Sequence, residues 1–210
     1  MSALKLLSVA AALLLCAGCS GLFRSHEPAT VTYQLRAPVV PAAAARVEAT
    51  LVIARPGAHP GLDGDRIVVL LPDRRVDAYA GARWSASLPR VVEALLADGF
   101  RASGGWRAVV TETSAFPGRY LLQSDIVQFT ADYSGGGAPI ARVTLRGELG
   151  IYSERRLVTS LETSAAVPAA ADRQRDVAAA FEAAYAKAAL ELIAAINEAA
   201  QAAEPPKRAP

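Results

Sequence analysis

The sequence predicts an α/β domain of the α+β type: a two-layer sandwich with a mostly antiparallel sheet and a short helix and a long C-terminal helix packed on one face. Residues 140–151 alternate between apolar and polar side chains, which is typical of an antiparallel strand with one buried and one solvated face. Short turns join this segment to strands before and after it, so the three form a meander. Residues 172–199 carry an apolar stripe at helical spacing and supply the second layer.

The composition favours one domain and argues against nucleic-acid binding. A chain of 210 residues is long enough for a single sizeable core. Its net charge is only +2, without the concentrated basic face of a nucleic-acid binder. Aromatic residues make up 6 % of the chain, so we expect a core built mostly from Val, Leu, Ile and Ala.

Residues 1–18 have the pattern of a lipoprotein signal peptide. Lys5 supplies a positive start, and residues 6–15 form an apolar run that is too short to span a bilayer as a helix. The small residues Ala17 and Gly18 follow, as a signal peptidase requires. We therefore expect this segment to be removed from the mature protein.

The segment CAGC at residues 16–19 resembles a bacterial lipobox, in which the final cysteine is acylated and becomes the mature N-terminus. Cys16 stands where leucine is usual. A redox or zinc motif is the competing interpretation, but the chain has no further cysteine and only His26 and His59, both in predicted loops. We predict lipidation of Cys19, with a diacyl anchor and an N-linked chain such as palmitate holding the protein on a membrane.

Residues 19–46 are expected to be the acylated N-terminus and a flexible tether, because Pro, Ala and Ser dominate them without an apolar period. A short extended piece at 31–35 interrupts this tether. Apolar alternation predicts a strand at 47–54, and a β-branched run predicts another at 66–72. The stretch between them is rich in Gly and Pro and predicts a loop, and a short extended piece follows at 75–79.

The first helix is predicted to start at Ser87, which is suited to the N-cap, with Pro89 in its first turn. Gly99 can take the left-handed position after the helix. The strands of the meander and the turns between them follow at 119–133, 134–139, 140–151, 153–155 and 156–167.

The last helix is predicted to begin at Asp172, which can cap it, and to end near residue 199. We expect residues 47–199 to form a single domain, because no internal repeat or linker divides them. Residues 200–210 are predicted to be a disordered tail.

No arrangement of residues points to catalysis, a cofactor or a metal. The segment SGGGAP lacks the G-K-[ST] ending of a phosphate-binding loop and joins two strands. The DGD segment at 63–65 lacks the further oxygens of a calcium loop. The turns DRR at 73–75 and ERR at 154–156 are interpreted as solvated turns, with a partner-binding patch as the alternative, and Trp84 and Trp106 as packing residues. We therefore expect a binding or assembly component and not an enzyme.

Four stretches carry a resemblance to a known family: YQL at 33–35, residues 62–96, YLLQSDIVQF at 120–129 and AAFEAAYAKAALELIAAI at 179–196. The most specific pattern is Tyr79…Arg83-Trp84…Leu88-Pro89, followed by an apolar helix. With the lipobox and the length, these residues make the chain similar to the ABC-type transport auxiliary lipoprotein family, the group that contains PqiC-like proteins. The resemblance covers nearly all of residues 31–199.

The resemblance implies a non-enzymatic lipoprotein anchored at the periplasmic face of the outer membrane. Members work with an MCE-domain protein and often an ABC transporter to move phospholipids or other hydrophobic molecules and to keep the outer membrane intact. Some form rings, so a homo-oligomer is left open. Ser20 also resembles a signal for outer-membrane sorting, and only Cys19 transfers as a functional residue. The alternative function is a stand-alone lipid-binding or envelope-assembly lipoprotein of the periplasm.

Overall fold

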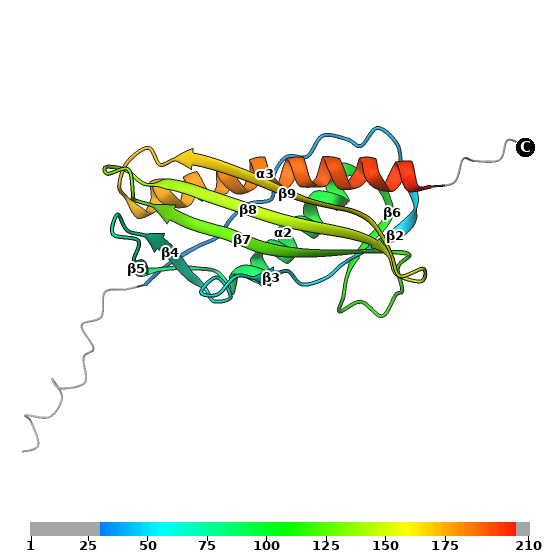
Figure 1. Cartoon of the computed structure of the whole chain (residues 1–210), viewed down its shortest axis with the longest axis horizontal. Helices are drawn as coiled ribbons and strands as arrows, with labels where there is room; N and C mark the ends of the chain where they lie inside the picture. The colour runs from blue at the N-terminus through cyan, green and yellow to red at the C-terminus, as the bar shows by residue number, and fades with distance from the viewer. Residues whose placement is uncertain (1–29, 205–210) are drawn as a thin grey trace, which may run out of the picture.

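The computed structural model describes residues 30–204 of the chain. The predicted signal peptide, Cys19 and residues 205–210 lie outside this range, so their roles stay predictions. Within it, nine strands form one sheet, and two helices pack against that sheet and against each other. Figure 1 shows an elongated domain in which β7, β8 and β9 run along the same axis as α3. The predicted α+β class, with a mostly antiparallel sheet and a long C-terminal helix, is confirmed.

The predicted meander consists of β7 (Tyr120–Asp132), β8 (Ile140–Ile151) and β9 (Arg156–Pro168). β7 pairs antiparallel with β8, and β8 with β9, over almost their whole lengths. The bounds of all three strands agree with the prediction to within one residue. In the turn between β7 and β8, Gly136 and Gly137 have positive φ, a conformation that carries no steric penalty for glycine.

The second edge of β7 is shared by short strands that follow one another along it. Three of them pair with β7 in parallel: β2 (Val47–Ile53), β3 (Gly57–Ala58) and β4 (Arg66–Leu70). β5 (Val76–Trp84) is antiparallel to β4. At one end of this series, β1 (Val31–Tyr33) is parallel to β5. At the other end, β6 (Trp106–Thr111) is parallel to β2. The long pairings are therefore antiparallel, and the parallel pairings are short.

Three of these short strands differ from the sequence prediction. β3 and β6 were not predicted, and β5 extends to Trp84, well beyond the short piece expected at 75–79. β6 pairs with β2, which lies far back in the sequence. Pairing at such a separation depends on tertiary packing, which short local patterns do not report.

α2 (Leu88–Ser103) is longer than the predicted helix, because Gly99 lies inside it instead of after it. A Cβ at Gly99 would stand 2.6 Å from Cδ1 of Ile193, so glycine at this position lets α2 approach α3 closely. The helix ends at Gly104, whose φ of 64° is the left-handed cap. Ser87 precedes the helix as expected but makes no side-chain cap hydrogen bond.

α3 (Gln174–Ala203) begins and ends slightly later than predicted. Asp172 does not cap it, because its carboxylate accepts a hydrogen bond from the hydroxyl of Tyr133. Arg173 occupies the N-cap position instead. At the other end the helix continues through residues 200–203, which were predicted to belong to a disordered tail.

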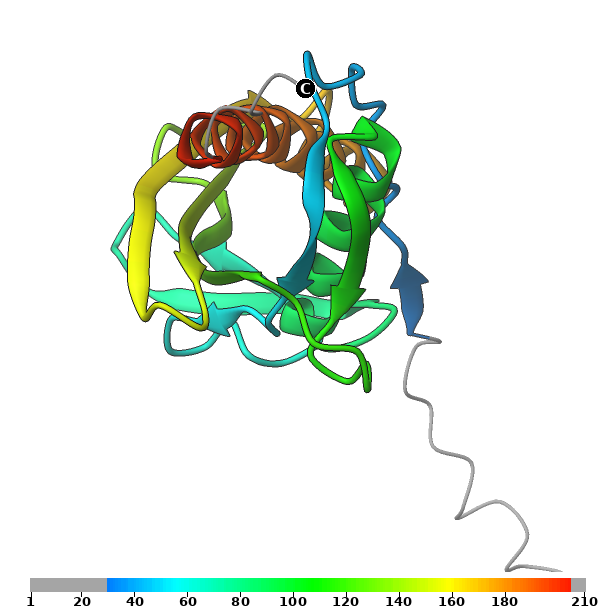
Figure 2. The same cartoon turned by 90° about the vertical axis from the view of Figure 1, so that its right-hand side faces the viewer.

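Small residues allow α3 to lie close to the sheet. A Cβ at Gly147 of β8 would stand 2.8 Å from Cδ1 of Leu192, so this strand has room for α3 only without a side chain. Thr163 of β9 donates a hydrogen bond from Oγ1 to the carbonyl of Ala188, at 2.9 Å. The face that α3 turns inward also buries a series of alanines: Ala180, Ala184, Ala188, Ala189 and Ala200. In the end-on view of Figure 2, α3 lies across the open side of the curved sheet.

Aromatic side chains fill the space between α3 and the sheet. Phe129 of β7 and Phe181 of α3 stack with ring centroids 4.9 Å apart, and Trp84 meets both rings edge-on. Trp106 packs edge-on against Tyr120 and donates a hydrogen bond from Nε1 to Oδ1 of Asn197, at 2.7 Å. Both tryptophans are buried, which confirms that they are packing residues.

Residues 36–46, expected to be a flexible part of the tether, lie along the helices as a strap. Leu35, just before it, is buried in the core. At the start of the strap, Arg36 pairs with Glu182 of α3, with Nη2 2.6 Å from Oε1. The backbone N–H of Arg36 also donates to Oε2 of Glu182.

The far half of the strap is held by hydrogen bonds to both helices. The N–H of Ala43 donates to the carbonyl of Ser103 at the end of α2, at 2.8 Å. Gln201 of α3 donates from Nε2 to the carbonyl of Ala45, at 2.7 Å. A composition rich in Pro and Ala indicated flexibility, but composition does not report contacts with distant helices, and the expectation of a loose segment here was wrong.

Gly147→Val is expected to lower the free energy of unfolding by about 1–3 kcal/mol, because a branched side chain would overpack the space that Leu192 fills. Denaturation in urea measures the change. The matched control is Gly135→Val, at a position with no other atom close to the added carbon. That variant should stay within about 0.5 kcal/mol of the original protein. Equal stability of the two variants would contradict the close packing of α3.

The strap should loosen at acid pH. The guanidinium of Arg36 holds the pKa of the Glu182 carboxyl below its ordinary value of 4.5. A carboxyl with a lowered pKa in the folded state contributes stability above its unfolded pKa and loses it as the pH falls through the folded value. The hydrogen-exchange protection of the Arg36 amide should therefore decline below about pH 4.5, relative to amides of β8. Glu182→Gln should remove this dependence, and a protection factor that stays constant to pH 3 would count against the pair.

Candidate docking surface

Three large exposed hydrophobic side chains gather at one end of the domain, which we call the distal tip. The distal tip is formed by the loop at 112–119, which precedes β7, by the turn at 152–155 between β8 and β9, and by the adjoining strand residues Leu121, Gly150 and Leu157. Phe116 is 74 % exposed, Tyr152 72 % and Leu157 58 %. In Figure 1 the described chain begins toward the left, whereas the distal tip lies at the right. Exposed apolar side chains gathered in one place are typical of interaction surfaces.

A β-bulge directs Leu157 to the outer face of the sheet. Thr159 lies opposite Leu149, but Leu157 lies opposite Gly150, so the register shifts at Val158. Simple alternation would have placed Leu157 on the same inner face as Thr159. Bulges of this kind redirect side chains and are frequent beside functional sites.

The bulge completes a row of residues across the three strands of the meander. On the outer face, Leu121 of β7 lies opposite Gly150 of β8, which lies opposite Leu157 of β9. The middle residue has no side chain, so the row has a hollow between two leucines. A Cβ at Gly150 would make only an ordinary contact, 3.5 Å from the carbonyl of Arg156. The hollow therefore exists because residue 150 has no side chain. The packing of the backbone does not itself require a glycine at this position.

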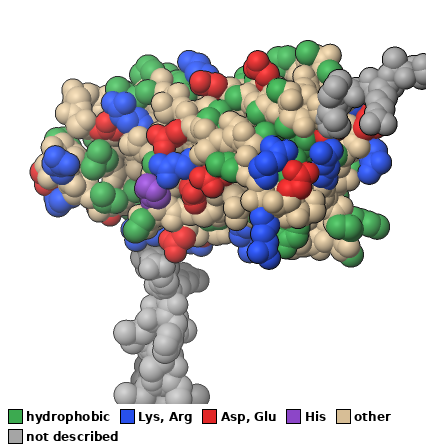
Figure 3. Space-filling view, turned by 45° about the vertical axis from the view of Figure 1, so that its right-hand side comes forward, with side chains coloured by type: hydrophobic (Ala, Val, Ile, Leu, Met, Phe, Trp, Pro, Cys, Tyr) green, Lys and Arg blue, Asp and Glu red, His purple; other side chains and the backbone are tan. Residues whose placement is uncertain are grey.

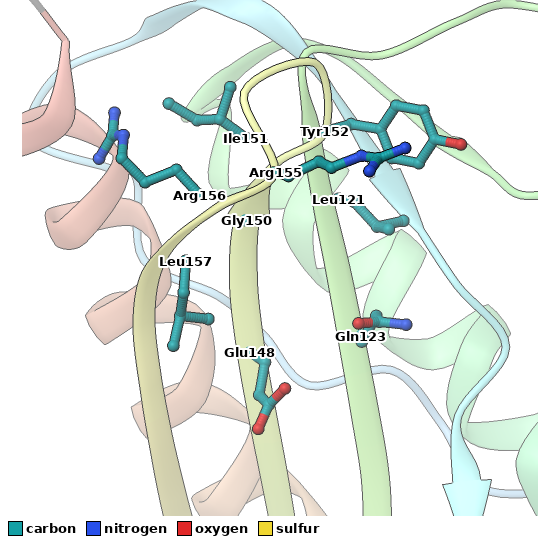
Figure 4. Close-up of a pocket in the computed structure, with 9 residues that line it drawn as sticks. All are labelled: Leu121, Gln123, Glu148, Gly150, Ile151, Tyr152, Arg155, Arg156 and Leu157. Atoms are coloured by element: carbon teal, nitrogen blue, oxygen red, sulfur yellow. The ribbon is translucent and has the colours of Figure 1, made fainter.

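Two cavities adjoin at the distal tip. The first, of about 360 Å³, covers the hollow, and Figure 4 shows the residues that line it, with Leu121 and Gln123 on β7 and Leu157 on β9. The second, of about 240 Å³, lies between the loop before β7 and β2 and includes Phe116. Leu121 and Tyr152 line both. The two cavities are thus shallow, mostly apolar and joined through these two shared residues.

Charged groups stand at the rim of the first cavity. Arg156 pairs with Glu154, with Nε 3.0 Å from Oε2. Arg155 makes no ion pair with any described residue, and its φ of 49° is unusual for a side chain other than glycine. Figure 4 shows Arg155 and Tyr152 extending on the same side of the turn. Across the face shown in Figure 3, acidic and basic side chains are interspersed.

The end of α3 supports the distal tip from behind. The hydroxyl of Tyr120 donates to Oε1 of Glu204 at 2.8 Å, and Arg119 pairs with the same oxygen at 2.8 Å. Burial, together with this hydrogen bond, raises the pKa of Tyr120 to about 12. The tyrosine therefore stays a neutral donor at physiological pH, and it fixes the start of β7 to the end of α3.

The structure does not bring the sequence-predicted candidates together. Cys19 lies outside the described residues, and His59 is exposed in the segment that follows β3. Asp65 of the DGD segment pairs with Arg83, and residues 30–204 contain no cluster of His, Cys, Asp and Glu suited to a metal. The SGGGAP segment is the β7–β8 hairpin turn, as predicted.

The two Arg-Arg turns share one arrangement. In each, the acidic residue pairs with the second arginine and the first has positive φ: Asp73 pairs with Arg75, and Glu154 with Arg156. All six residues of the two turns are exposed to solvent, as expected of solvated turns. Only the ERR turn adjoins the hollow, so the alternative interpretation as a partner patch applies to this turn.

Sequence reasoning missed the residues of the distal tip. Gly150 and Leu157 meet because of the bulge, which no local pattern indicated. Phe116 and Tyr152 were detectable in principle, since each is an aromatic residue within a turn-rich polar stretch.

Within the described range, no helix combines the length and the apolar character needed to cross a membrane.

Comparisons with known proteins agree with the resemblance seen in the sequence. The family model described as the ABC-type transport auxiliary lipoprotein component matches residues 33–193. This family is not a known enzyme family. No curated protein matches the chain.

Solved structures share the fold. A DUF330-family protein from Xanthomonas campestris is 29 % identical with a TM-score of 0.77, and the match covers 82 % of this chain and 98 % of that one. An uncharacterised protein is 13 % identical with a TM-score of 0.64, over 80 % and 99 % of the two chains. A hypothetical protein from Chlamydia trachomatis is 8 % identical with a TM-score of 0.52, over 74 % and 99 %.

Proposed function

Because the chain belongs to the ABC-type transport auxiliary lipoprotein family, we propose that it is the accessory component of an MCE/ABC-type system that moves lipids or other hydrophobic compounds. In this proposal it is a periplasmic lipoprotein, anchored in the outer membrane through acylated Cys19, and it contributes to maintenance of that membrane. Its partners are an MCE-domain protein and the subunits of an ABC transporter. It acts by binding them and catalyses no reaction.

The observation that carries this proposal is the distal tip. An anchor at Cys19 attaches the membrane to the N-terminal side of the domain, and the apolar surface lies at the far end from the first described residue. α3 spans the distance between these ends, and its 30 residues correspond to about 45 Å. A protein held in this way presents its apolar surface away from its own attachment point.

The form of the distal tip suits a protein partner. Its cavities, of about 360 and 240 Å³, are shallow and at or below the lower end of the range for small-molecule sites. Each can accept a side chain from a partner, which is how apolar anchors bind at the centre of protein interfaces. Arg155 and Glu148 at the rim supply the polar border of such an interface.

Gly150→Leu should abolish most partner binding, because the new side chain would fill the hollow between Leu121 and Leu157. The protein is purified from crosslinked envelopes, and the co-purified MCE-domain protein is quantified by mass spectrometry. Loss of one anchor is expected to reduce the yield of partner about tenfold or more, which corresponds to about 1.4 kcal/mol. The matched control is Gly135→Leu in the β7–β8 hairpin, which has open space around it and should capture partner normally.

Cysteine variants test the membrane anchor separately from the docking surface. Cys19→Ser should give unprocessed protein without acyl labelling, whereas Cys16→Ala should keep the label.

Absence of any MCE-domain protein from the wild-type sample would contradict the transport role and favour the stand-alone alternative. Normal capture by Gly150→Leu would retain the role and reject the distal tip as its surface.

A further inference from the structure

The strap encloses an apolar groove on the outer side of α3. The groove lies between strap residues 40–44 and the helix, and its cavity has a volume of about 550 Å³. Figure 1 shows the strap running over the C-terminal half of α3, with the distal tip on another part of the domain. No residue lines both this groove and the distal tip.

Small side chains keep the groove open. The strap contributes Pro41 and three consecutive alanines, and α3 contributes the exposed Ala194 opposite them. The same Pro- and Ala-rich composition that predicted a tether thus leaves space between the strap and the helix. Val40, Leu190 and Ile193 add the larger apolar surfaces.

One end of the groove is polar. Asn197 and Gln201 line it, but both already make hydrogen bonds: Asn197 accepts from Trp106, and Gln201 donates to the strap carbonyl of Ala45. Glu198 is exposed and makes no ion pair with any described residue. It is the only charged residue that lines the groove.

From this arrangement we propose that the strap groove binds a single-chain amphiphile whose head group carries an amine. The alkyl chain lies along Leu190, Ile193 and Ala194, and the ammonium group pairs with Glu198. From residue 190 to residue 201 the helix rises about 16 Å, which gives the chain an extended path. A separate cavity, of about 410 Å³, lies nearer the start of α3, between the first residues of the strap and the helix.

The charge of Glu198 sets the ligand class. A carboxylate at the edge of an apolar groove attracts a cation and repels an anionic head group. The groove has the size of a ligand site, with mostly apolar walls and few polar groups. The space between α3 and the sheet does not offer an alternative site, because Phe129, Phe181 and Leu192 fill it. This inference goes beyond the proposed function, since it does not depend on partner docking.

Photoreactive lysophosphatidylethanolamine, with the reactive group on its acyl chain, tests the proposal on the full chain in detergent. Labelled peptides are located by mass spectrometry. We expect the label on residues 40–44 or on the part of α3 from 190 to 201. Photoreactive lysophosphatidylglycerol, which has the same chain and an anionic head group without an amine, should label this site at least fivefold less.

Two pairs of variants make the result specific. Ala194→Trp fills the groove and should reduce labelling at least fivefold, whereas Ala202→Trp, exposed on the same helix outside the groove, should not. Glu198→Gln should remove the preference between the two probes, and Glu191→Gln, another exposed carboxylate of α3, should keep it. Labelling that Ala194→Trp leaves unchanged, or equal labelling by both probes in the original protein, would overturn the proposal.

Capture of the MCE-domain protein is measured on the same Ala194→Trp sample. Normal capture with lost labelling supports two separate sites. Failure of capture in the original protein, together with groove labelling that responds to Ala194→Trp, would reject the proposed function and leave this inference standing.

Discussion

The close contact between α3 and the meander is the constraint on which the rest of the domain depends. It exists because β8 has no side chain at Gly147, where Leu192 enters, and because the inward face of α3 is rich in alanine. Thr163 adds a hydrogen bond to the helix backbone at Ala188. At such short separation, larger residues on either side would have to displace the helix, and a displaced helix would change every surface that α3 supports.

Those surfaces are three, and each is attached to a different part of α3. Glu182, in the first half, holds the start of the strap through Arg36. The middle and the last turns form the inner wall of the strap groove. Glu204, just after the helix, holds Tyr120 and Arg119 beneath the distal tip. A single helix therefore fixes the spacing between the N-terminal side of the domain and its apolar end, which is what the proposed role between a membrane and a partner requires.

The sequence was a good guide wherever the controlling interactions are local. The alternation in residues 140–151 predicted β8 to the residue, because one face of that strand is buried along its whole length. The sequence failed where distant segments decide the structure. β6 exists through pairing with β2, Gly99 continues a helix because Ile193 packs there, and residues 36–46 are held by groups of α2 and α3. The candidate site was hidden for the same reason: by alternation alone Leu157 belongs to the inner face, and only the bulge at Val158 brings it beside Gly150.

The central claim is that the distal tip faces the partner protein. A photo-crosslinking residue in place of Tyr152, in cells that produce the full chain, tests it most directly. The matched position is Val76, which is 68 % exposed and is the first residue of β5, directly after the turn from β4. In Figure 1, β4 and β5 lie toward the left, away from the distal tip. We predict crosslinks to the MCE-domain protein from position 152 and none from position 76. Crosslinks from position 76 alone, or from neither position, would contradict this account.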